Sequence, residues 1–125
     1  LVETIKRNTD AKVLMHSDGS IYYLIPDLID IGVEALNPVQ VSAKDMGSER
    51  LKAEFGKDLS FWGGIDTQGV LSTATPEEVR QEVRTRINDL GAGGGYVLTS
   101  VHNIQAEVPA ANIAAMFDEA VNPTG

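Results

Sequence analysis

The sequence predicts an α/β fold of the (β/α)8 TIM-barrel class, present here as about four βα units with parallel strands. Three observations carry this prediction. Four short apolar segments are typical of buried strands, helical patterns separate them, and the order is (α)βαβαβαβα. A complete barrel takes roughly 250 residues, so 125 residues suit half of one. A small open parallel sheet remains the alternative.

The four strand segments are apolar over most of their length rather than strictly alternating. This pattern is typical of parallel strands that are covered on both faces. The predicted strands are residues 11–16, 33–37, 59–65 and 95–101.

The helical segments are indicated by apolar spacing and by end signals. Residues 20–32 place apolar side chains on one face, and Pro26 marks either a kink or the true start. A shorter helix covers 48–56. The next one has Thr75 as N-cap, Glu78 completing a capping box and Gly91 as C-cap. The last begins near Pro109, and residues 1–8 suit the tail of a preceding helix.

The composition excludes several classes of partner. Ten basic against 18 acidic residues give a net charge of −8, which disfavours binding to nucleic acid or to an anionic membrane. There is no cysteine, so neither a disulfide nor a thiolate metal site can form. No apolar run approaches the roughly 20 residues that span a bilayer. We expect a cytoplasmic protein, and a chain that starts at Leu1 is expected to be a piece of a longer one.

Functional groups of parallel α/β folds collect at the carboxyl ends of the strands. Both histidines of the chain fall there, together with several amides and carboxylates. This coincidence is the main physical argument for a site. The candidates at the four ends are His16, Ser17 and Asp18; Asn37 and Gln40; Gly63, Gly64, Asp66 and Thr67; His102 and Asn103.

Two kinds of chemistry fit these candidates. His16, Asp18 and His102 could form a two-histidine, one-carboxylate site for zinc or iron(II), although Asp18 could equally cap the following helix. Asp66 is either a functional residue, acting as an acid, a base or a partner for a cation, or a turn residue. The run "GAGGGY" precedes a strand and so has the wrong order for a dinucleotide fingerprint; it predicts a flexible connection.

Three stretches carry a family resemblance over nearly the whole chain. They are "HSDGSIYYLIPDLIDIGVEALNPVQ", "FWGGIDTQGVLSTATPEEVRQEV" and "GGGYVLTSVHNIQAEVPAANIAAMFDEA". Together they resemble the C-terminal half of the uroporphyrinogen decarboxylase superfamily, which also contains zinc-dependent methyltransferases acting on corrinoid-bound methyl groups. The resemblance implies that residues 1–125 form the last four units of a (β/α)8 barrel.

The two branches of that superfamily imply different roles for the same residues. On the decarboxylase branch the resemblance places His102 in the tetrapyrrole pocket, near a substrate carboxylate. The branch's usual asparagine is replaced by Gly64, and its key aspartate belongs to the other half. On the methyltransferase branch, zinc is held by a His-x-Cys pair and a late cysteine. His16 matches that histidine, Asp18 stands at the first cysteine, and His102 lies near the second.

Three functions follow as expectations. The preferred one is metal-assisted methyl transfer from a corrinoid or a methylated small molecule, with zinc on His16, Asp18 and His102. The second is cofactor-free decarboxylation of a tetrapyrrole acid. The predicted catalytic residues are His102 and Asp66. The third is an inactive half-barrel that forms a homodimer through its exposed inner surface. The predicted substrate-binding residues are Ser17, Asn37, Gln40, Gly63, Gly64, Thr67 and Asn103.

Overall fold

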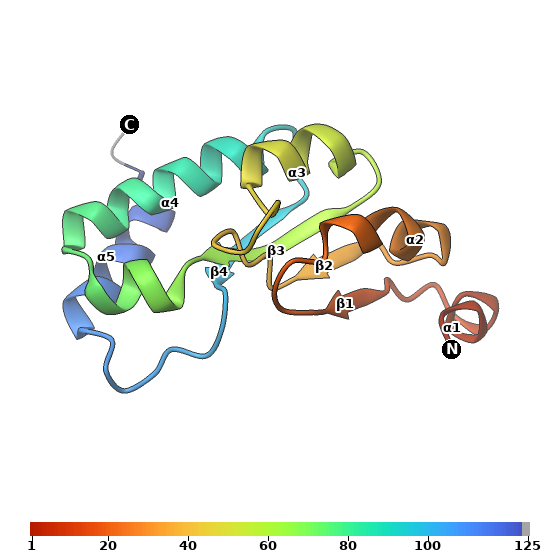
Figure 1. Cartoon of the computed structure of the whole chain (residues 1–125), viewed down its shortest axis with the longest axis horizontal. Helices are drawn as coiled ribbons and strands as arrows, with labels where there is room; N and C mark the ends of the chain where they lie inside the picture. The colour runs from red at the N-terminus through yellow and green to blue at the C-terminus, as the bar shows by residue number, and fades with distance from the viewer. Residues whose placement is uncertain (124–125) are drawn as a thin grey trace.

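The computed structural model describes residues 1–123 and contains one four-stranded parallel sheet (Figure 1). The strands are β1 (Leu14–His16), β2 (Ala35–Asn37), β3 (Ser60–Ile65) and β4 (Tyr96–Ser100), and they lie side by side in chain order. Every neighbouring pair is parallel. The predicted strands are therefore confirmed in number, order and direction, and β1 and β2 are shorter than their apolar runs.

The helices follow the strands in the expected alternation. They are α1 (Val2–Asn8), α2 (Ile25–Asp30), α3 (Ser48–Phe55), α4 (Pro76–Gly91) and α5 (Ala110–Val121). In Figure 1, α3 and α4 run along the sheet, α5 lies beside α4, and α1 lies at the far end near β1. Of the helices in the described part, none has the length and apolar character needed to cross a membrane.

The predicted start signals of α4 are confirmed, whereas the exact ends of the other elements differ from the prediction. Thr75 and Glu78 form the predicted capping box, while Gly91 is the last helical residue and Ala92 is the C-cap. Pro26 lies in the first turn of α2, where its missing N–H costs nothing, and a 3-10 turn, η1 (Tyr22–Leu24), precedes it. A short π-helical turn, η2 (Thr67–Leu71), follows β3 and was not predicted.

Two separate groups of buried side chains pack the helices against the sheet and against one another. The first lies under α2 and α3 and is centred on Leu36, Leu51 and Phe61. The second lies between η2, α4 and α5 and is centred on Leu71, Val83 and Met116. Strand β3 and helix α4 contribute to both groups, so they form the connection between two otherwise distinct cores.

The face of the sheet turned away from the helices is open. It exposes Leu14, Trp62 and Val97, which are 44%, 41% and 43% accessible. Trp62 and Val97 alternate along their strands with the buried Phe61 and the partly buried Tyr96. This is the inner face of a half barrel, and homodimer formation through it stays a prediction.

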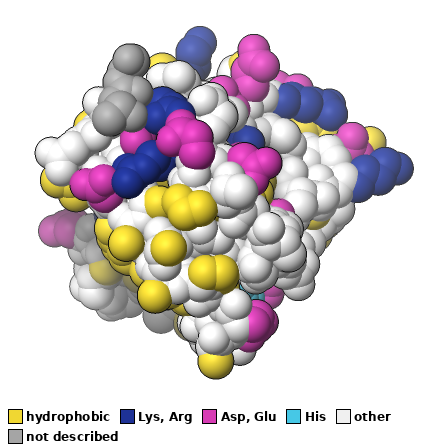
Figure 2. Space-filling model, turned by 90° about the vertical axis from the view of Figure 1, so that its left-hand side faces the viewer, with side chains coloured by type: hydrophobic (Ala, Val, Ile, Leu, Met, Phe, Trp, Pro, Cys, Tyr) yellow, Lys and Arg dark blue, Asp and Glu magenta, His cyan; other side chains and the backbone are white. Residues whose placement is uncertain are grey.

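The end of the molecule that carries α5 is shown in Figure 2, where hydrophobic side chains gather below neighbouring basic and acidic ones. Phe117 and Val121 of α5 are exposed, whereas Glu119 is fully buried. The Glu119 carboxylate lies 3.2 Å from the Arg84 guanidinium and 3.6 Å from that of Arg80. These pairs join α4 to α5.

Candidate functional site

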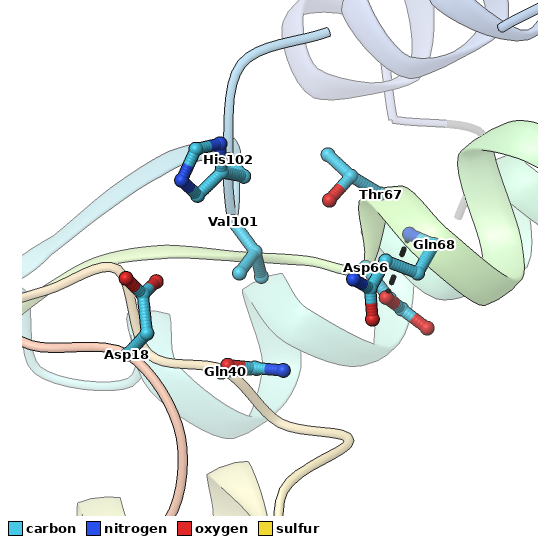
Figure 3. Close-up of a pocket in the computed structure, with 7 residues that line it drawn as sticks. All are labelled: Asp18, Gln40, Asp66, Thr67, Gln68, Val101 and His102. Carbon is cyan, nitrogen blue, oxygen red and sulfur yellow. Dashed lines mark hydrogen bonds between the residues drawn. The ribbon is translucent and has the colours of Figure 1, made fainter. Parts of the chain in front are cut away.

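A pocket of about 240 Å³ opens at the carboxyl ends of the strands (Figure 3). Figure 3 shows Asp18 and His102 on one side of it, Thr67 and Asp66 on the other, and Gln40 between them. Five of the predicted site residues therefore meet in one place. The complete lining is Asp18, Gln40, Asp66, Thr67, Gln68, Val101 and His102.

A neighbouring hollow on the inner face collects half of the other candidates. It is lined by His16, Asn37, Thr99, Ser100, Val101, His102, Asn103 and Ile104. His102 and Val101 line both spaces, so the two are adjacent. Ser17, Gly63 and Gly64 line neither. Gln68, Thr99 and Ser100 also lie at the predicted strand ends, although the predicted site did not include them.

Asp66 is held in place by the backbone of η2. Its Oδ1 accepts a hydrogen bond from the Gln68 N–H at 3.1 Å, and its Oδ2 accepts one from the Gly69 N–H at 3.2 Å. This caps η2 and is the turn role weighed for Asp66 from the sequence. Each carboxylate oxygen keeps a lone pair for the pocket. A catalytic role for Asp66 stays a prediction.

Gln40 presents a donor to the pocket. Its Oε1 accepts from the Gly19 N–H at 2.8 Å, which fixes the orientation of the side-chain amide. The amide nitrogen points toward Asp66 in Figure 3. The contact also ties the segment after β2 to the loop after β1, so two strand ends are joined at the floor of the pocket.

Gly63 and Gly64 are required by packing around the end of β3. Both have positive φ, 123° and 88°. A Cβ on Gly63 would lie 1.7 Å from the Pro38 carbonyl oxygen, which accepts the Gly64 N–H at 3.1 Å. The Tyr96 hydroxyl donates to the Gly63 carbonyl at 2.9 Å, and burial raises the pKa of that hydroxyl. Pro38 therefore fills the space beside Gly63 where a substrate contact was expected, and that contact stays a prediction.

The three predicted metal ligands are not gathered into one site. His16 Nε2 lies 3.5 Å from Asp18 Oδ2. Within residues 1–123, however, no group of three or more His, Cys, Asp or Glu side chains is arranged to hold a metal ion. His102 is therefore not grouped with His16 and Asp18. The described residues therefore do not form a complete metal site by themselves, so we derive no step through a metal, and the zinc site stays a prediction.

Comparison with known proteins identifies the family. The family model described as "Uroporphyrinogen decarboxylase (URO-D)" matches residues 1–122. The chain belongs to the uroporphyrinogen decarboxylase family. The uroporphyrinogen decarboxylase of Psychromonas ingrahamii is 37% identical over 78 residues, covering 62% of this chain and 21% of that protein. That of Actinobacillus succinogenes is 35% identical over 67 residues, covering 54% and 18%.

A solved structure supports the fold of this family member. A methyltransferase from Methanosarcina mazei superposes with a TM-score of 0.75 at 16% identity, over 97% of this chain and 34% of that one. At that identity the likeness shows the fold alone. The superfamily and the half-barrel architecture expected from the sequence are thus confirmed. The chain spans about a fifth of the length of the curated relatives that it matches.

Proposed function

We propose that this chain forms one substrate-binding side of a uroporphyrinogen decarboxylase-type carboxy-lyase, with His102 contacting a carboxylate of the tetrapyrrole. The observation that carries the proposal is the pocket at the strand ends, whose lining brings His102 together with the hydrogen-bonding side chains of Gln40 and Thr67. Relatives named uroporphyrinogen decarboxylase, at 35–37% identity, support the substrate class. We prefer this to methyl transfer because the described residues assemble no three-ligand metal set.

The pocket offers two types of group to such a substrate. The His102 ring, the Gln40 amide nitrogen and the Thr67 hydroxyl can donate hydrogen bonds to a carboxylate. The carboxylates of Asp18 and Asp66 suit N–H groups instead, because they would repel an acidic substituent. No arginine or lysine lines this pocket. A cationic clamp for further substrate carboxylates would therefore come from other parts of the parent barrel.

The proposal is tested by titrating the chain with uroporphyrin, the oxidised and fluorescent form of the substrate. We expect saturable quenching, with the dissociation constant raised at least about tenfold in His102→Leu, which has no donor, since a charge-assisted hydrogen bond is worth about 1.5–3 kcal/mol. His16→Leu is the matched control, because His16 does not line this pocket. Absence of saturable binding, or equal affinity in His102→Leu and wild type, would overturn the proposal.

Methyl transfer remains the second candidate because one observation favours it. His16 and Asp18, which occupy the positions of a His-x-Cys ligand pair, lie 3.5 Å apart and could contribute two ligands to a metal. Elemental analysis of protein purified without chelator and supplied with zinc separates the candidates. Near-stoichiometric zinc that is lost in both His16→Ala and His102→Ala would favour a methyltransferase acting on a corrinoid or another methyl donor. Zinc-free wild-type protein would favour the carboxy-lyase.

A further inference from the structure

Asn37 bridges three strands at the rim of the inner face. It ends β2 and is the register partner of His16, the last residue of β1. Its side-chain oxygen lies 2.5 Å from His16 Nδ1, and its side-chain nitrogen lies 3.4 Å from the carbonyl oxygen of Trp62 in β3. Asn37 therefore touches His16 directly, which gives it a role beside the substrate contact expected from the sequence, and that substrate contact stays a prediction.

The Trp62 carbonyl determines which way the Asn37 amide is turned. A backbone carbonyl oxygen can only accept a hydrogen bond, so the amide NH2 of Asn37 must face it. The amide oxygen then faces His16 Nδ1. The assignment of oxygen and nitrogen in this side chain thus follows from chemistry at its other end.

The same reasoning fixes the hydrogen on the His16 ring. Because the Asn37 oxygen only accepts, Nδ1 must carry the hydrogen and donate it. In the neutral ring Nε2 is then left with a lone pair. Nε2 lies 3.5 Å from the Asp18 carboxylate, which is also an acceptor. The ring and the carboxylate consequently present two acceptors toward the same space at the strand ends.

We propose that Asn37 is a positioning residue that holds His16 in its Nδ1–H tautomer, so that Nε2 and the Asp18 carboxylate together form an acceptor pair for one N–H or O–H donor of a ligand. Without Asn37, Nε2 would carry the hydrogen and donate it to Asp18, and the two groups would satisfy each other. Asn37 keeps them available to a ligand. The tautomer assignment does not depend on the substrate proposed above.

The tautomer is measured by ¹⁵N–¹H correlation spectra of the histidine rings, at a pH well above the measured midpoint of the ring titration. The chain has two histidines, so His102→Gln leaves only the His16 signals. We expect Nδ1–H in the His102→Gln background. Adding Asn37→Leu, which removes the acceptor at similar size, should move the hydrogen to Nε2. Adding Asn37→Asp, which keeps an acceptor, should preserve Nδ1–H.

Asn103→Leu in the same background is the matched control, since Asn103 lines the same hollow but has no hydrogen bond to His16 among the described contacts. It should leave the tautomer unchanged. An Nε2–H ring in the His102→Gln protein would overturn the proposal without any Asn37 variant. A ring that stays Nδ1–H in a folded Asn37→Leu protein, as judged by its amide spectrum, would also overturn it.

Discussion

Replacing Asn112 by alanine tests how η2, which carries part of the pocket, is fixed to the rest of the molecule. Asn112 lies on α5 with an exposed fraction of 1%. Its side-chain nitrogen donates to the Leu71 carbonyl at 3.0 Å and to the Ala74 carbonyl at 2.8 Å. Both carbonyls belong to the segment that leads from η2 into α4. One side chain therefore ties that segment to a helix about 40 residues later.

The expected loss of stability follows from these two bonds. A buried polar group left without its hydrogen-bond partner costs about 1–3 kcal/mol. The buried Leu71 carbonyl should lie near the upper end of this range, and the part-buried Ala74 carbonyl, which water can reach, near the lower end. The higher helix propensity of alanine offsets about 0.5 kcal/mol of this loss. We therefore expect Asn112→Ala to lower the free energy of unfolding by about 3 kcal/mol.

Urea unfolding followed by circular dichroism measures this change. With an m value of about 1–1.5 kcal/mol/M, the midpoint should fall by about 2–3 M. Asn103→Ala, an exposed amide, is the control and should change stability by less than about 0.5 kcal/mol. An Asn112→Ala midpoint equal to that of Asn103→Ala would refute the reasoning that these hydrogen bonds fix η2.

Three further predictions concern a turn, an acid transition and a surface. Gly63→Ala should destabilise the protein far more than Gly93→Ala. Both positions have positive φ, but only at Gly63 would the added Cβ meet a backbone carbonyl oxygen, at 1.7 Å. Equal urea midpoints for the two variants would contradict this prediction. Hydrogen bonds from Lys12 and Lys6 lower the pKa of Glu34 from 4.5 to about 2. The Glu34 carboxylate therefore stabilises the fold above pH 4.5, and this contribution is lost as the pH falls toward 2. Glu34→Gln should reduce the loss of stability over that pH range in an acid denaturation curve, and an unchanged curve would argue against the prediction. If the open face mediates a homodimer, Trp62→Lys should shift sedimentation velocity from dimer to monomer, whereas a monomeric wild type would rule the dimer out.

The order of strands and helices was readable from the sequence because each element has a local signal. Apolar runs marked the strands, and Thr75 with Glu78 marked the start of α4. The lengths of β1 and β2 were not readable, because an apolar run does not show how many of its residues find a partner on the neighbouring strand. The turn η2 has a local cap in Asp66, but its tie to Asn112 on α5 lies too far along the chain for any local pattern to reveal it.

The candidate site was predictable as a location but not as an arrangement. Parallel strands bring their carboxyl ends to one edge, so Gln40, Thr67 and His102 could be expected to meet. Whether His102 faces His16 depends on the path of the loop after β4, and the spacing of residues carries no information about it. Likewise, the contact of Asn37 with His16 requires the strand register, which the structure supplies.

The pocket lies across the connection between the two cores described above. Asp18 and Gln40 belong to loops beside the first core, while Asp66 and Thr67 belong to the segment that packs on the second. Units that share few buried contacts can open independently, and hydrogen exchange then reports different protection for each. A ligand that contacts both sides would couple their opening. Occupancy of the pocket should therefore appear as slower exchange at amides far from it, on α5 as well as on α2.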